Sequence, residues 1–136
     1  MSREQNIAAQ ESLAESINNG DLDAAMESFS VDALDHDPAP GQGPGRAGFK
    51  DFFTELTSAF PDAHIEPAML VADDEHVCVA YKLTGTHKGD FQGIAATGRS
   101  IDVRGVQIGR FANGQIVERW GSTDEVGILR QIGELS

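Results

Sequence analysis

The sequence is poor in cysteine, in long apolar runs and in basic residues. Its single cysteine, Cys78, cannot form an intrachain disulfide and is typical of a reducing compartment. No apolar run approaches the roughly 20 residues that a membrane-spanning helix needs. The opening Met-Ser-Arg-Glu-Gln-Asn leads into no apolar segment of a secretory signal. These absences predict a cytoplasmic protein.

Lysine and arginine together number 10, against 22 aspartates and glutamates, so the net charge at pH 7 is −12. Nucleic acids and anionic membrane surfaces are bound through basic patches. We therefore expect neither a nucleic-acid partner nor a membrane partner. A chain of 136 residues fits one domain, residues 1–136, that is long enough to bury a hydrophobic core.

Helices are predicted in the first half of the chain. Apolar residues at helical spacing predict a helix over 2–18 and a short second helix that begins after Asp21. A third helix over 46–60 has a broad apolar face made of Phe49, Phe52, Phe53, Leu56 and Phe60. This face fits core packing against a sheet, and it also fits the wall of an apolar cavity in which Phe53 would contact a ligand.

Strands are predicted from residue 62 onward. A short early strand over 31–35 precedes four strands over 64–71, 76–86, 98–111 and 115–124, which we expect to form an antiparallel meander. Pro67 indicates an edge strand or a bulge. Helices segregated from a mostly antiparallel sheet define an α+β fold. A curved sheet wrapped around three N-terminal helices would enclose a pocket.

The last two strands form a long hairpin around Asn113-Gly114, because both residues tolerate the positive φ of a tight hairpin turn. In the first of these strands the apolar positions change from odd to even at Gly105, which predicts a β-bulge there. In the second strand, one face mixes apolar and acidic groups, as a pocket lining would. Its members are Ile116, Glu118, Trp120, Ser122 and Asp124.

An ordered set of short motifs covers nearly the whole chain: Asp35-His36-Asp37-Pro38, Gly45-Arg46-x-Gly48-Phe49-Lys50, Ala59-Phe60-Pro61-Asp62, Gly85-Thr86-His87-x-Gly89-x-Phe91-x-Gly93-Ile94, Thr97-Gly98-Arg99, and Asn113-Gly114-x-Ile116-Val117-Glu118-x-Trp120 followed by Asp124. With these motifs the chain resembles the SnoaL-like polyketide cyclases, or ester cyclases, of the NTF2-like superfamily. The resemblance implies an α+β cone, a homodimer or larger assembly, and ring closure by an intramolecular aldol step without cofactor or metal.

The resemblance also suggests catalytic residues. Asp124 matches the general acid/base of the cyclases. Shielding from water beside Trp120 would favour that role, whereas an N-cap of a terminal helical turn is the alternative. The chain departs from the family where the neighbouring strand would offer a histidine, because that strand has only Gln107 and Arg104 as polar partners. By position, Gln107 is expected to donate a hydrogen bond to a developing enolate oxygen.

The remaining candidates each have a structural alternative. His36 is expected at the cavity mouth as an acid or hydrogen-bond donor, or else bonded to backbone near Pro38. Glu118 would be a second pocket acid, or would pair with Arg104 or Arg46, because a buried carboxylate needs a partner. Trp120 would orient a ligand carbonyl through its indole N–H, and His87 would line the pocket or be a structural histidine whose polar atoms are satisfied by hydrogen bonds.

Metal and phosphate sites are disfavoured. Asp35, His36 and Asp37 point to alternating sides of an extended chain and cannot chelate one ion together. The Gly43-x-Gly45 segment lacks the longer glycine-rich phosphate motifs. The sequence therefore predicts a cofactor-independent cyclase or isomerase acting on an apolar carbonyl compound such as a polyketide. A non-catalytic binding or dimerisation module of the same fold is the alternative.

Overall fold

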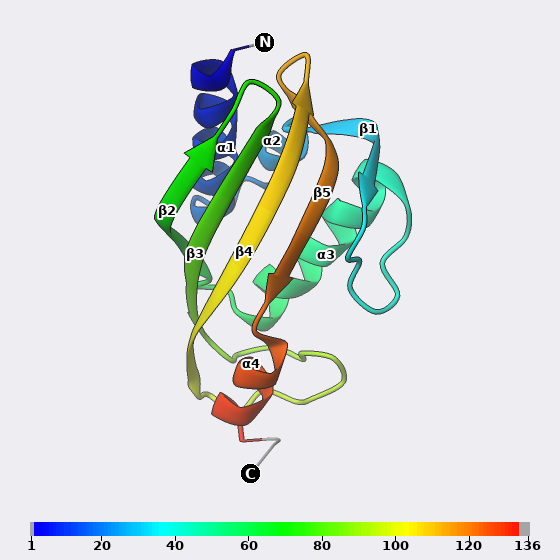
Figure 1. Ribbon diagram of the computed structural model, residues 1–136. Helices are drawn as coiled ribbons and strands as arrows, with labels where there is room; N and C mark the ends of the chain where they lie inside the picture. The colour runs from blue at the N-terminus through cyan, green and yellow to red at the C-terminus, as the bar shows by residue number, and fades with distance from the viewer. Residues whose placement is uncertain (1, 134–136) are drawn as a thin grey trace.

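The computed structural model describes residues 2–133, in which one sheet carries all the strands (Figure 1). The strand order is β1-β5-β4-β3-β2. The strands are β1 (Phe29–Asp35), β2 (His64–Ala72), β3 (His76–Thr86), β4 (Ser100–Ala112) and β5 (Gln115–Thr123). The four later strands form the predicted antiparallel meander, and β1 adds to its edge parallel to β5.

Three helices cover one face of the sheet, while the opposite face is toward the viewer in Figure 1. They are α1 (Arg3–Asn18), α2 (Leu22–Met26) and α3 (Gly45–Ala59), and a fourth, α4 (Glu125–Gln131), follows β5. Side-chain caps fix where three of them begin: Ser2 forms a capping box with Gln5, and Asp21 and Asp124 cap α2 and α4. Helices segregated from a mostly antiparallel sheet confirm the predicted α+β fold. None of the helices within residues 2–133 has the length and apolar character to span a bilayer.

The core lies between α3 and the inner face of the sheet, where α1 and α2 close its side. Phe29 of β1 stacks on Phe49 of α3 with ring centroids 4.2 Å apart, and both rings are buried. Burying an aromatic side chain of this size contributes about 1.5–3 kcal/mol to stability. The aromatic face predicted for the third helix therefore does pack against the sheet.

Two predicted turn and bulge signals are confirmed. Asn113 and Gly114 both have positive φ, 53° and 78°, at the tip of the β4–β5 hairpin. On the edge strand β2, the register shifts between Pro67 and Met69, because proline cannot donate to the ladder.

The predicted bulge at Gly105 is wrong. All of β4 alternates regularly with its odd residues inward, and its register with β3 is continuous. The register shift lies instead where Arg110 pairs with Glu118 but Phe111 pairs with Ile116, so that Val117 is an extra residue in β5. This bulge exchanges the two faces of β5 beyond Ile116: Trp120 faces outward with Ile108, and the odd residues line the inner face.

Candidate active site

A cavity of about 820 Å³ lies between the inner face of the sheet, helices α1 and α3, and the loop that follows β1. This volume is within the range of about 300–1,000 Å³ that is typical of small-molecule sites. Much of the wall is apolar, with Leu13, Ile17, Phe49, Phe53, Leu56 and Leu83 among its residues. Phe53 is thus both a core residue and a cavity residue, and the two interpretations of the aromatic helix face are compatible.

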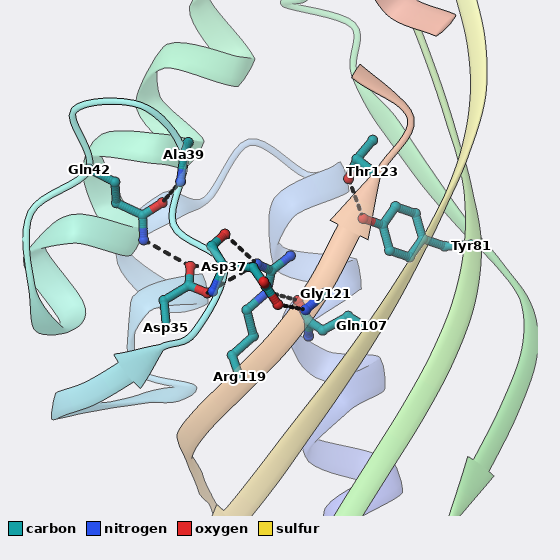
Figure 2. Close-up of polar contacts among 9 residues, drawn as sticks. All are labelled: Asp35, Asp37, Ala39, Gln42, Tyr81, Gln107, Arg119, Gly121 and Thr123. Atoms are coloured by element: carbon teal, nitrogen blue, oxygen red, sulfur yellow. Dashed lines mark hydrogen bonds and ion pairs between the residues drawn. The ribbon is translucent and has the colours of Figure 1, made fainter. Parts of the chain in front are cut away.

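One part of the cavity wall is polar and is organised around Arg119 and Asp35 (Figure 2). These residues are register partners on the adjacent parallel strands β5 and β1. Arg119 Nη1 lies 3.2 Å from Asp35 Oδ1, and the two side chains are only 13% and 8% exposed. Charges this far from water need partners, and each of these groups is the other's counter-ion.

Asp35 is further held by the loop before α3. Its Oδ2 accepts a hydrogen bond from Gln42 Nε2 at 3.0 Å, and its Oδ1 accepts one from the backbone N–H of Asp37 at 3.0 Å. Asp37 in turn accepts from the backbone N–H of Gly121 at 2.9 Å, which ties the loop to β5. This network fixes the loop over the cavity.

Gln107 extends the network from Arg119 toward the helices. It lies on the inner face of β4, is 9% exposed, and lines the cavity, where the resemblance to the cyclases had assigned it by position. Its Oε1 is 3.2 Å from Arg119 Nε, and its Nε2 is 3.5 Å from Gln10 Oε1 on α1. A polar chain thus runs from Asp35 on one side of the cavity to Gln10 on the other.

Tyr81 and Thr123 form a second polar pair on the wall, farther along β5 (Figure 2). The Tyr81 hydroxyl lies 2.6 Å from Thr123 Oγ1. Tyr81 projects from β3 across β4 at Gly105, where the absence of a side chain leaves room for the ring.

Asp124 immediately follows β5 and also lines the cavity. Its Oδ1 accepts a hydrogen bond from the backbone N–H of Gly127 at 2.8 Å, so it is the N-cap of α4. The N-cap alternative is therefore confirmed, and the position of Asp124 at the cavity leaves its acid/base role a prediction. The side chain is exposed, and Trp120 does not shield it, since Trp120 is on the outer face of the sheet.

His36, Glu118 and Trp120 lie together outside the cavity, which corrects the predicted pocket face. The bulge at Val117 turns Glu118 and Trp120 outward, and His36 points the same way because its neighbours Asp35 and Asp37 face inward. The His36 ring stacks on Trp120 at 4.7 Å, and its Nε2 lies 2.8 Å from Glu118 Oε2.

Glu118 also pairs with Arg110, whose Nε is 2.6 Å from Glu118 Oε1. This partner differs from the predicted Arg104 or Arg46. Hydrogen bonds from His36 and Arg110 lower the pKa of Glu118, since they favour the charged carboxylate.

Arg104 and His87 are likewise not among the residues that line the cavity. Arg104 is an even residue of β4, exposed on the outer face. His87 is fully buried beside Phe60, and its Nδ1 accepts the backbone N–H of Thr97 at 3.2 Å. Its burial matches the structural alternative, although its Nε2 has no hydrogen-bond partner within residues 2–133.

The sequence predictions therefore place Phe53, Gln107 and Asp124 at the cavity and miss Arg119, Asp35 and Tyr81. A signal for Asp35 existed, because the alternation within Asp35-His36-Asp37 separates it from His36. Regular alternation along β5 would place Arg119 on the outer face, but the extra residue Val117 turns Arg119 to the inner face. As for metal sites, no group of three histidine, cysteine or acidic side chains gathers as metal ligands within residues 2–133.

The sequence model of the SnoaL-like polyketide cyclase family matches residues 7–132, and the chain belongs to this family. Its α+β structure is the NTF2-like cone of the family. The aklanonic acid methyl ester cyclase of Streptomyces peucetius is 29% identical over 128 residues, which are 90% of this chain and 86% of that protein.

Solved structures agree with this assignment. IdmH of Streptomyces antibioticus, a proposed polyketide cyclase, is 30% identical, with a TM-score of 0.82 over 95% of this chain and 99% of that one. AclR of Streptomyces galilaeus, a proposed hydroxylase, is 24% identical, with a TM-score of 0.88 over 99% of this chain and 100% of that one. This second likeness shows the fold alone, since one fold supports several chemistries.

Proposed function

We propose that the protein is a cofactor-independent cyclase that closes a ring in an apolar, carbonyl-bearing small molecule such as a polyketide. The observation that carries the proposal is a large, mostly apolar cavity whose wall contains a carboxylate, Asp124, and an amide donor, Gln107. The family and its cyclase relatives support the same reaction class.

The charges around the cavity favour an uncharged ligand. Glu11, Glu55, Asp124 and Glu125 belong to its wall. Among the described lining residues Arg119 is the single cation, and Asp35 already neutralises it. A free carboxylate on the ligand would be repelled, whereas ketone and ester carbonyls are tolerated.

In the proposed reaction, Asp124 accepts a proton from the carbon beside a carbonyl group. The resulting enolate carbon forms a carbon–carbon bond with a second carbonyl carbon of the same molecule, and the alkoxide so formed takes the proton back from Asp124. No atom is gained or lost, so the step needs no co-reactant. A ligand that fills the cavity covers Asp124 and excludes water from the reacting groups.

We also propose that two copies of the chain associate through the outer face of the sheet. Val71, Cys78, Ile108 and Trp120 are register neighbours across β2 to β5 and form an apolar outer stripe. Val71 is 61% exposed and Ile108 is 37% exposed, so a second copy would bury apolar surface there.

The exposed, helix-capping position of Asp124 favours a second candidate function, a non-catalytic small-molecule binding module. Solvent deuterium exchange distinguishes the two functions. A panel of aromatic polyketide esters and steroid-like ketones is screened by ligand-observed NMR, and binders are followed in D₂O for exchange beside the carbonyl. Protein-dependent exchange supports the cyclase. Binding without exchange overturns it and leaves the binding module.

A further inference from the structure

The orientation of the Gln107 side chain follows from its partners. An amide oxygen only accepts hydrogen bonds, its nitrogen only donates, and a guanidinium only donates. Because Arg119 Nε lies 3.2 Å from the amide, the group facing Arg119 must be the oxygen. The NH₂ group of Gln107 is therefore directed away from Arg119, toward Gln10 and the cavity.

Arg119 is itself fixed in place by acceptors. Asp35 holds its Nη1 at 3.2 Å, and the backbone oxygen of Asp37 lies 3.4 Å from the same atom. The Asp35 carboxylate is held by Gln42 at 3.0 Å. Donors and acceptors thus alternate along the series of hydrogen bonds from Gln42 to Gln10. Each side-chain amide in this series therefore has one allowed orientation.

The hydrogen bond between Gln107 and Gln10, at the end of this series, is the weakest. Gln107 Nε2 is 3.5 Å from Gln10 Oε1, at the limit of a hydrogen bond, whereas Gln42 donates to Asp35 at 3.0 Å and Arg119 donates to Asp35 and to Gln107 at 3.2 Å. An N–H group of Gln107 is therefore easily redirected to a ligand oxygen without breaking a strong contact.

We propose that Arg119, held by Asp35, is a positioning residue that keeps the Gln107 NH₂ group facing the cavity, so that it donates a hydrogen bond to the carbonyl oxygen of the substrate. The inference rests on the proposed function, in which this oxygen becomes the enolate oxygen when Asp124 removes the neighbouring proton. If the amide rotated by half a turn, its own oxygen would face the developing negative charge and oppose it.

The test compares two ligands that differ in one atom group. 2-Acetonaphthone carries a carbonyl oxygen, and 2-isopropenylnaphthalene has a CH₂ group in its place, so the ratio of their Kd values isolates the hydrogen bond to oxygen. Calorimetry or ligand-observed NMR is suitable, because Trp120 lies on the outer face and its fluorescence would not report the cavity. We expect the wild type to prefer the ketone by about fivefold.

Gln107→Met should abolish this preference. Arg119→Met should also abolish it, although the residue need not touch the ligand, and it should cause no further loss in the Gln107→Met background. Arg119→Lys should restore part of the preference, since lysine can still donate to the Gln107 oxygen. A merely structural role for Arg119 would weaken both ligands by the same factor and leave the ratio unchanged.

Arg119→Met strands the Asp35 carboxylate and could unfold the chain, so the series includes Arg119→Met combined with Asp35→Asn, which leaves no unpaired charge. A ketone preference that survives in this double variant overturns the inference. Because the readout is binding, it is independent of turnover. If the wild type catalyses exchange beside the carbonyl but the ratio of Kd values is unchanged in the Arg119 variants, this inference alone is overturned. If the ratio is lost in those variants but the wild type catalyses no exchange, only the cyclase function is overturned.

Discussion

The ring of Tyr81 occupies the space that a side chain at Gly105 would need. A Cβ atom built at Gly105 would lie 2.4 Å from the Tyr81 hydroxyl oxygen and from the ring carbon that bears it. The two residues are register partners on β3 and β4. Glycine at 105 therefore allows Tyr81 to lie across the strand and reach Thr123.

Gly105→Ala should displace the Tyr81 ring and break its hydrogen bond to Thr123. We expect a loss of about 1–3 kcal/mol in the free energy of unfolding, measured by urea denaturation, because the added methyl group would overpack the space that the Tyr81 ring fills. Gly109→Ala is the matched control on the same strand face, since its Cβ would meet its nearest neighbour, Phe111 Cε1, at 3.3 Å, which a small shift relieves. Equal stability of the two variants would contradict this account.

The buried ion pair predicts a second stability difference. Asp35→Ala removes the counter-ion of Arg119, and an uncompensated buried charge costs about 3–5 kcal/mol. Asp23→Ala breaks the exposed pair with Lys50, 3.6 Å long, and should cost less than about 1 kcal/mol. Urea unfolding of the two variants measures both values, and similar losses would show that the Arg119–Asp35 pair is not buried as described.

The pair of Glu118 with His36 and Arg110 predicts an acid dependence of stability. The pKa of Glu118 is lowered in the folded state, so the contribution of this carboxylate is present above its unfolded value, about 4.3, and is lost as the pH falls through its folded value. Glu118→Gln should therefore flatten the fall in unfolding free energy below about pH 4.3.

Since Glu118 lies outside the cavity, the same variant should bind 2-acetonaphthone with an unchanged Kd. If the unfolding free energy of Glu118→Gln falls with pH as in the wild type, the hydrogen bonds from His36 and Arg110 do not stabilise the Glu118 carboxylate. If Glu118→Gln binds the ligand more weakly, Glu118 contributes to the ligand site.

The outer stripe predicts how the chain associates. Ile108→Glu places a charge in the middle of the stripe and should convert a dimer to a monomer in sedimentation velocity experiments. Val31→Glu is the control, because Val31 is 67% exposed on β1 and does not belong to the stripe. A dimer that persists in Ile108→Glu, or a wild type that is monomeric, would contradict association through this face.

Most of the fold could be predicted from local patterns. Helical spacing, caps, the Asn113-Gly114 turn and the alternation in β3 are each set by residues near one another in the sequence. The order of elements and the antiparallel meander followed from these. The parallel pairing of β1 with β5 joins residues far apart in the chain, and no local signal specifies it.

The candidate site was less predictable, because one extra residue changes which face a strand presents. Regular alternation from Ile116 predicted that Trp120 and Glu118 line the pocket. The bulge at Val117 depends on the pairing with β4 and reverses the face, so that Arg119 points inward instead. Gln107 was assigned by position from the family resemblance, and it lies on the inner face because β4 alternates regularly, without the bulge predicted at Gly105.

In the proposed reaction Asp124 is the base in the cavity, and Asp124→Asn is the variant that removes this base. Asparagine is a good N-cap, so the bond to the Gly127 N–H is kept while the basic carboxylate is lost. Asp21→Asn makes the same change at the cap of α2, where the side chain accepts from Ala24.

The measurement is the rate of solvent deuterium exchange beside the carbonyl of a bound ketone, at saturating ligand. We expect Asp124→Asn to bind the ketone with an affinity close to that of the wild type but to lose exchange at least about 100-fold, while Asp21→Asn exchanges at the wild-type rate. Exchange that continues at the wild-type rate in Asp124→Asn would show that Asp124 is not the base.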